Sequence, residues 1–250
     1  VAGGIPIIRT IKEGLITNKI NKIYGILNGT TNYILSHMES SGKNFYDVLN
    51  NAKKLGFAES NPLSDLSGSD SSDKLRILSS IAFSKNISKN KILTEGIQNI
   101  NLTDILYAKR FGYKIKLLSI SEIKKSRLVE RVHPCLVSGN SFLANIDGVL
   151  NAIVIDATPV GKSALQGEGA GPGPTSSALI SDLCSVLRGN IKYPFGIPSK
   201  LRKKTIKFDI LKHTCSSYFR IEVKDLPGVL SSITKIFAIN KISIKNLLQN

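Results

Sequence analysis

The chain has 250 residues, of which 42% are hydrophobic and 21% charged, so it carries enough apolar side chains for one sizeable core and a second, smaller one. Because no run of about 18 apolar residues occurs, and because the start VAGGIPIIRT has neither a basic segment nor a long apolar one, the sequence predicts no membrane span and no signal peptide. The net charge of +16 would suit a nucleic-acid partner, but the lysines are dispersed among Asn and Ile, which favours a solvated basic surface and no nucleic acid.

The cysteines and histidines predict neither a disulfide framework nor a metal site. They are few and widely spaced: Cys135, Cys184, Cys215, His37, His133 and His213. None of them forms a CxxC pair or shows metal-ligand spacing. We therefore expect free thiols and a reducing, cytoplasmic compartment.

Hydrophobic periodicity predicts a mixed α and β chain. Helices are expected over 6–17, from 30 or 31 to 38, over 45–55, 71–84 and 103–112, and over 175–187. Strands are expected over 22–28, 114–123, 128–137 and 148–157. The segments 57–70 and 161–174 are rich in Gly, Pro and Ser and are expected to be loops. Residues 191–212, with two prolines and a basic run, are interpreted as a linker.

The junction between the loop 57–70 and the helix 71–84 gathers unlike charges. Lys74 falls inside the apolar stripe that contains Leu75 and Leu78, where an ammonium is costly unless it is paired. Asp70 lies one turn before Lys74 and can pair with it, and Glu59 and Asp65 add negative charge nearby. Such a group can hold a substrate ammonium and move a proton. A capped helix with a snorkelling lysine is the structural alternative, and the chemistry of these residues leaves both interpretations open.

The segment GFAESNPLSDLSGSDSSDKL resembles the signature of the homoserine dehydrogenase family, in which a G-[YF]-x-E-x-x-P stretch leads through spaced aspartates to a lysine. The matching positions are Gly56, Glu59, Pro62, Asp65, Asp70 and Lys74. The resemblance implies that Glu59, Asp65 and Asp70 bind an amino-acid substrate and that Lys74 is the catalytic acid–base. Phe57 stands where many relatives have Tyr.

Three further segments are similar to the same family. In GILNGTTNYIL, Gly29 and Thr30 match a turn beside the substrate. In GEGAGPGPTSSALISDL, Gly169 and Gly171 match a loop at the nicotinamide end of the cofactor NAD(P). In VAGGIPIIR, the matching positions for backbone ligands of a monovalent cation such as Na⁺ are Val1, Gly3 and Ile5.

A dinucleotide fingerprint G-x-G-x-x-G is absent, and the chain starts without Met. Together with the resemblance, this indicates a piece that lacks the N-terminal nucleotide-binding half and is inactive alone. The family's second active-site lysine also belongs to that upstream part.

The C-terminal segment from about residue 213 resembles the start of an ACT domain. Residues 218–223 alternate as in a strand, 225–228 predict a turn, and a helical stripe and a second strand follow. The resemblance implies a βαβ part of a ferredoxin-like unit, with Asp225 and Gly228 nearest an effector such as L-threonine; a docking module without a ligand is the alternative.

The combined expectation is an α+β fold, with an open sheet covered by helices on one face and followed by a partial ACT unit. The expected catalytic domain is 1–190, of which 167–187 returns to the nucleotide-binding domain, then the linker 191–212 and the ACT part 213–250. The resemblance implies NAD(P)-dependent interconversion of L-homoserine and L-aspartate 4-semialdehyde in threonine, methionine and isoleucine biosynthesis. It also implies threonine regulation and a homodimer or homotetramer. A non-catalytic amino-acid-binding regulatory protein is the competing interpretation.

Overall fold

The computed structural model describes residues 1–87, 92–190, 193–204 and 213–249. The chain divides into two compact units, Val1–Thr214 and Cys215–Asn250. Of the predicted linker, 191–192 and 205–212 lie outside the described residues. Its described part contacts the first unit, where Lys203 donates its N–H to Ser84 O at 3.0 Å.

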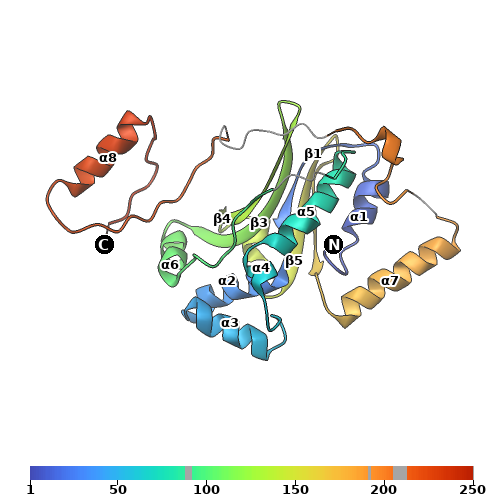
Figure 1. The fold of residues 1–250 in the computed structure, drawn as a ribbon, viewed down its shortest axis with the longest axis horizontal. Helices are drawn as coiled ribbons and strands as arrows, with labels where there is room; N and C mark the ends of the chain where they lie inside the picture. The colour runs from blue at the N-terminus through green and yellow to red at the C-terminus, as the bar shows by residue number, and fades with distance from the viewer. Residues whose placement is uncertain (88–91, 191–192, 205–212, 250) are drawn as a thin grey trace. The chain divides into compact units, whose positions relative to one another are not determined.

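The first unit is a six-stranded sheet with helices, shown in Figure 1. Its helices are α1 (Ile7–Arg9), α2 (Gly29–Ser41), α3 (Phe45–Lys54), α4 (Leu63–Leu66), α5 (Ser69–Ala82), α6 (Leu102–Arg110) and α7 (Pro172–Leu187). The strands are β1 (Lys19–Ile26), β2 (Leu93–Thr94), β3 (Tyr113–Lys124), β4 (Arg127–Ser138), β5 (Leu150–Thr158) and β6 (Gly161–Glu168). Short π-helical and 3-10 turns are η1 (Thr10–Gly14), η2 (Phe142–Asn145) and η3 (Ser199–Leu201).

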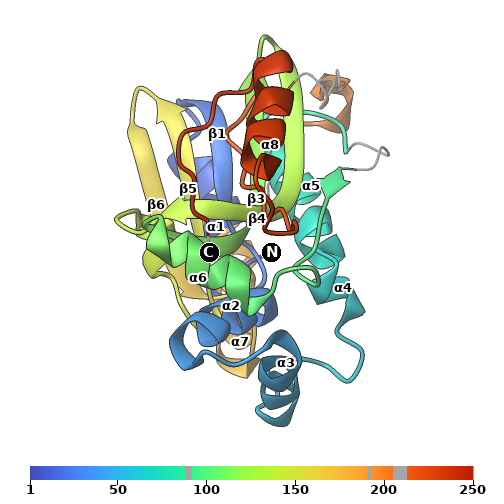
Figure 2. The same cartoon turned by 90° about the vertical axis from the view of Figure 1, so that its left-hand side faces the viewer.

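The strands are ordered β2-β4-β3-β1-β5-β6, and all neighbours are antiparallel except β2 and β4. Alternation along the strands produces two apolar faces. On one face Ile23 and Ile155 pack in the same core as Leu75 and Leu78 of α5, and on the other Ile120 and Val154 pack near η2. The helices cover mainly the first face, with α2 and α3 at one end of the strands (Figure 2), as the α+β expectation required.

Several elements of the first unit differ from the prediction, among them the short helix α4, which forms within the segment 57–70 that was expected to be a loop. The helix expected over 6–17 is only one α-turn followed by the π-helical η1, which ends at Gly14. The segment expected as a Gly-rich loop forms strand β6, which pairs with β5 along its whole length. An edge strand with one solvent face can be polar and glycine-rich, because the ladder to β5 supplies its backbone hydrogen bonds.

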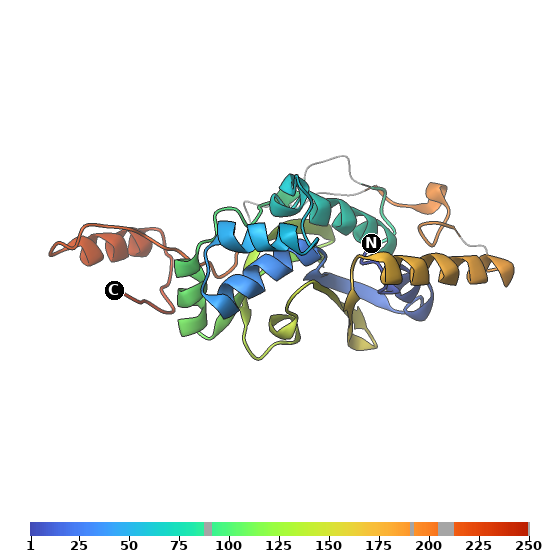
Figure 3. The ribbon, with the colours of Figure 1, turned by 90° about the horizontal axis from the view of Figure 1, so that it is seen from below.

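Helix α7 projects away from the sheet (Figures 1 and 3) and has no fully buried residue. Its apolar side chains are exposed: Leu179, Ile180, Leu183, Val186 and Leu187. No helix in the described part of the chain is long and apolar enough to cross a membrane.

In the second unit the turn and the helix form as expected, but the described residues form neither of the two expected strands. Helix α8 (Val229–Ile239) begins after Gly228, and the described residues on either side of it form no strand. Phe219 packs its ring 5.8 Å from that of Phe237, while Ile221 and Val223 remain exposed. A strand needs a neighbour to satisfy its backbone groups, and alternation in the sequence alone does not provide one.

The central strand β1 leaves no room for a side chain at Gly25. A Cβ there would lie 2.1 Å from Ala152 O and 2.8 Å from Ile153 Cα on β5. We predict that Gly25→Ala lowers the free energy of unfolding by about 1–3 kcal/mol, because the β1–β5 ladder must shift. Denaturant unfolding of the chain measures this, and Gly14→Ala, which meets nothing within 4 Å, is the matched control. Equal stability of the two variants would contradict the close packing.

Candidate active site

The predicted ion pair between Asp70 and Lys74 is present. Helix α5 begins at Ser69, so the two side chains lie one turn apart on the same line, and Lys74 Nζ is 2.7 Å from Asp70 Oδ2. Lys74 also donates to Leu27 O at 3.1 Å, at the end of β1. The Lys74 and Asp70 side chains are 27% and 29% exposed, so the pair is less buried than its position in the apolar stripe predicted.

Asn28, which the sequence argument did not select, connects the carboxylates. Its Nδ2 donates to Asp65 Oδ1 at 2.7 Å and to Asp70 Oδ2 at 2.9 Å. Its Oδ1 accepts the backbone N–H of Thr31 at 2.9 Å, so Asn28 is the N-cap of α2. The helix therefore begins at Gly29, one or two residues before the expected start. The signal was available, because Asn is among the residues that favour this position.

Gly29 and Thr30 form the first turn of α2 beside these carboxylates. A Cβ on Gly29 would lie 2.6 Å from Val149 O, so the backbone of this turn packs closely against the segment before β5. Thr30 donates its hydroxyl to Phe57 O at 2.7 Å and thereby fastens the loop that carries Glu59.

Glu59 itself is exposed. Among the described residues, no hydrogen bond or ion pair joins its carboxylate to Asp65, Asp70 or Lys74. The structure thus pairs Asp70 with Lys74, connects Asp65 to Asp70 through the Asn28 amide and leaves Glu59 on the adjoining loop.

The two glycine-containing segments, far apart in the sequence, lie side by side. Gly4 donates its N–H to Glu168 O at 3.1 Å, and a Cβ on Gly3 would lie 2.5 Å from Gly169 O. A Cβ on Gly169 would lie 2.0 Å from the Asn151 amide, so any larger residue there would have to displace the buried Asn151 side chain. Gly171 has φ +109° and precedes α7.

The segment Val1–Ile5 also reaches the charged pair. Ala2 and Ile5 are buried in the same apolar core as Leu75, the residue that follows Lys74 on α5. The predicted cation segment, the predicted cofactor loop and the Asp70–Lys74 pair therefore converge on one part of the first unit.

The remaining predicted residues belong to the second unit. Gly228 has φ +88° and is the N-cap of α8, three residues after Asp225.

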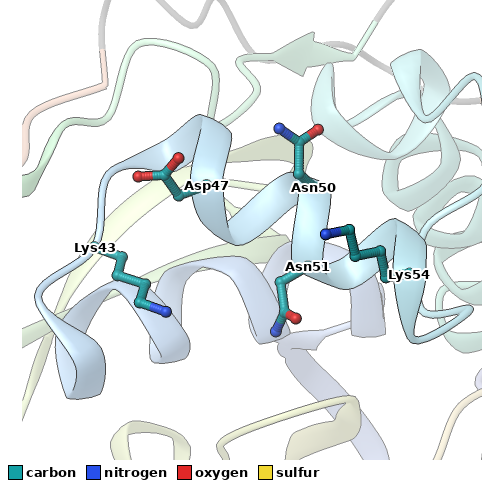
Figure 4. A pocket seen from close by; sticks show the side chains of 5 residues that line it. All are labelled: Lys43, Asp47, Asn50, Asn51 and Lys54. Carbon is teal, nitrogen blue, oxygen red and sulfur yellow. The ribbon is translucent and has the colours of Figure 1, made fainter.

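An open hollow on the outer face of α3 is lined by Lys43, Asp47, Asn50, Asn51 and Lys54 (Figure 4). None of the predicted site residues lines it. Among the residues that the structure covers, no group of three or more His, Cys, Asp or Glu side chains could hold a metal ion.

The partial exposure of the Asp70–Lys74 pair limits how much the pair contributes to the free energy of unfolding. We predict that Asp70→Ala lowers the free energy of unfolding by about 1–3 kcal/mol, since Lys74 and Asn28 both lose an acceptor. This is less than a fully buried pair would contribute. Asp73→Ala on the same helix, which breaks only an exposed pair with Arg76, should cost less than about 1 kcal/mol. Equal unfolding midpoints of the two variants would count against the network.

Comparison with known proteins agrees with this geometry. Residues 6–184 match the homoserine dehydrogenase family. The chain is 43% identical to a homoserine dehydrogenase of Helicobacter pylori, covering 100% of this chain and 59% of the relative. A homoserine dehydrogenase structure from Thiobacillus denitrificans superposes with a TM-score of 0.88 at 38% identity, covering 100% of this chain and 59% of that one.

A more distant structure, described as a hyperthermophilic archaeal homoserine dehydrogenase mutant in complex with NADPH, has a TM-score of 0.63 at 28% identity. It covers 76% of this chain and 54% of that one. The chain thus spans about three fifths of the length of the relatives it matches. Because the family match covers well over half of these residues, the chain belongs to the homoserine dehydrogenase family.

Proposed function

We propose that this chain supplies the substrate-binding and proton-transfer part of an enzyme that interconverts L-homoserine and L-aspartate 4-semialdehyde with NAD(P). The observation that carries the proposal is the Asn28 amide, which holds Asp65 and Asp70 together beside the Lys74 ammonium. A retired enzyme that only binds an amino acid has no chemical need for this lysine.

The carboxylates fit the ammonium group of an amino-acid substrate. Asp65 lies on α4, Asp70 in the first turn of α5 and Glu59 on the loop before α4, so a cation entering here meets negative charge from three segments. The first turn of α2, with Gly29 and Thr30, presents backbone at the same place. In this proposal Glu59 is the mobile partner, since its carboxylate has no contact with the other two.

Lys74 holds or moves the proton at the substrate hydroxyl oxygen. Two of its three ammonium donors are directed to Asp70 and to Leu27 O, which fixes the orientation of the third. In the reduction direction the ammonium donates its third proton to the developing alkoxide, and in the oxidation direction the neutral amine form of the lysine accepts the hydroxyl proton. Its partial exposure leaves space for the substrate to approach.

The loop at Gly169 and Gly171 fits the nicotinamide end of NAD(P). Neither glycine carries a Cβ that would separate the backbone from a flat ring, and Gly171 opens the loop at φ +109°. When bound, the nicotinamide supplies the hydride transfer. The archaeal relative described in complex with NADPH supports NAD(P) as the cofactor. We further propose that 167–187 belongs with a nucleotide-binding domain, because α7 exposes apolar side chains around its surface.

The segment Val1–Ile5 fits a monovalent cation only in part. Ala2 and Gly3 have positive φ, so the backbone makes a tight turn here, but the Ile5 carbonyl already accepts the N–H of Ile7 at 2.7 Å. We retain Val1, Gly3 and Ile5 as the proposed ligands. Four further expectations stay predictions from the family resemblance: threonine binding at Asp225 and Gly228, the homo-oligomeric state, the cytoplasmic location and the biosynthetic pathways.

The test is homoserine-dependent reduction of NADP⁺ by the full-length protein that contains this chain. We predict that Lys74→Ala lowers kcat by about a hundredfold or more while the KM for homoserine changes little, because the lost group acts on the proton. Lys54→Ala, an exposed lysine on α3, is the control and should retain full turnover.

Two outcomes would overturn the proposal. Equal turnover of Lys74→Ala and the parent protein would remove Lys74 from the mechanism. If a folded parent protein does not reduce NADP⁺ but binds threonine in calorimetry, the non-catalytic amino-acid-binding alternative would replace the enzyme.

A further inference from the structure

Lys116, in the middle of β3, is a charged side chain with only 1% of its surface exposed. It lies on the same face of the strand as Leu118 and Ile120, where an unpaired ammonium would be strongly unfavourable. Each of its three donors has an acceptor: Asn32 Oδ1 at 3.1 Å, Ile146 O at 2.5 Å and Asp147 Oδ1 at 2.8 Å. The proton-transfer chemistry makes no use of this lysine.

The acceptors of Lys116 join helix α2 to the loop before β5. Asn32 also donates its amide to the carbonyls of Ile146, Gly148 and Leu150, at 3.0–3.2 Å. One turn further along α2, Ser36 Oγ accepts the N–H of Gly148 at 3.1 Å. Hydrogen bonds therefore hold the loop 146–150 on α2. The Lys116 ammonium binds both Asn32 of α2 and the loop residues Ile146 and Asp147.

The same loop touches the first turn of α2. A Cβ built on Gly29 would lie only 2.6 Å from Val149 O. The backbone of Gly29 therefore packs directly against the loop. Gly29 follows Asn28, whose amide holds both carboxylates of the candidate active site. A displacement of the loop would therefore move the Asn28–Thr30 backbone.

The electrostatics of the pair agree with this geometry. Burial lowers the pKa of Lys116, and the hydrogen bond and charge of Asp147 oppose that effect. Burial alone would raise the pKa of Asp147, yet Lys116 and Lys114 hold it below its ordinary value. Each group thus favours the charged form of the other.

We propose that Lys116 is a positioning residue for substrate binding: it clamps the loop 146–150 against α2 and thereby fixes the Asn28–Gly29–Thr30 turn. The inference rests on the proposed function, because that turn is taken to face homoserine. Lys116 itself contacts neither substrate nor cofactor.

The test compares Lys116→Met with Lys114→Met in the full-length protein. Lys114 contacts the same Asp147, at 3.3 Å, but makes none of the contacts to Asn32 or Ile146. We expect Lys116→Met to raise the KM for homoserine by about tenfold or more, while the KM for NADP⁺ and the kcat stay within about threefold. Lys114→Met should leave all three constants near the parent values. A merely structural loss would lower the active fraction and leave the KM for homoserine unchanged.

Hydrogen–deuterium exchange on the same variants separates this proposal from the proposed function. Lys116→Met should accelerate exchange in both 28–36 and 146–150, and Lys114→Met in neither. If the parent protein does not oxidise homoserine, the proposed function fails, and the exchange result alone decides whether the clamp exists. Unchanged exchange, or an unchanged KM for homoserine in an active enzyme, would overturn the positioning role.

If Lys116→Met does not fold, Ser36→Ala provides the second test. It removes only the contact to the Gly148 N–H and the hydroxyl's own bonds within α2. A KM for homoserine raised by about two- to fivefold, with faster exchange in 146–150, would support the clamp. Parent-like values for both would contradict it.

Discussion

The candidate site depends on the carboxamide of Asn28. One amide nitrogen lies within 2.9 Å of carboxylate oxygens from both Asp65 and Asp70, which would otherwise repel each other at this separation. The amide and the Lys74 ammonium together offset that repulsion. Because the same side chain caps α2, the helix start, the short helix α4 and the start of α5 are placed by a single residue.

A second polar network fixes the opposite side of α2. The helix lies between the carboxylate cluster at its N-cap and the loop 146–150, which Asn32 and Lys116 hold. Gly29 is the point at which both constraints meet, since any side chain there would separate helix and loop. Buried polar groups of this kind are stable only when their donors and acceptors are satisfied, and for that reason they specify one arrangement rather than several.

Sequence periodicity predicted the long elements because their patterns are local. The expected helices correspond to α2, α3, α5, α6 and α7, and the expected strands to β1, β3, β4 and β5. Periodicity failed where pairing decides the outcome. Strand β6 has loop composition but gains its hydrogen bonds from β5, whereas the two strands expected in the second unit alternate correctly and find no partner among the described residues.

The sequence alone determined the family of the chain and the pairing of Asp70 with Lys74. Asp70 and Lys74 are four residues apart on one helix, so their contact follows from helix geometry. Only the tertiary structure revealed Asn28 and Lys116, whose roles depend on partners from distant segments. It also brought Gly3 against Gly169 and left Glu59 apart from its neighbours. These contacts are fixed by the packing of the sheet and α2, and no local pattern encodes them.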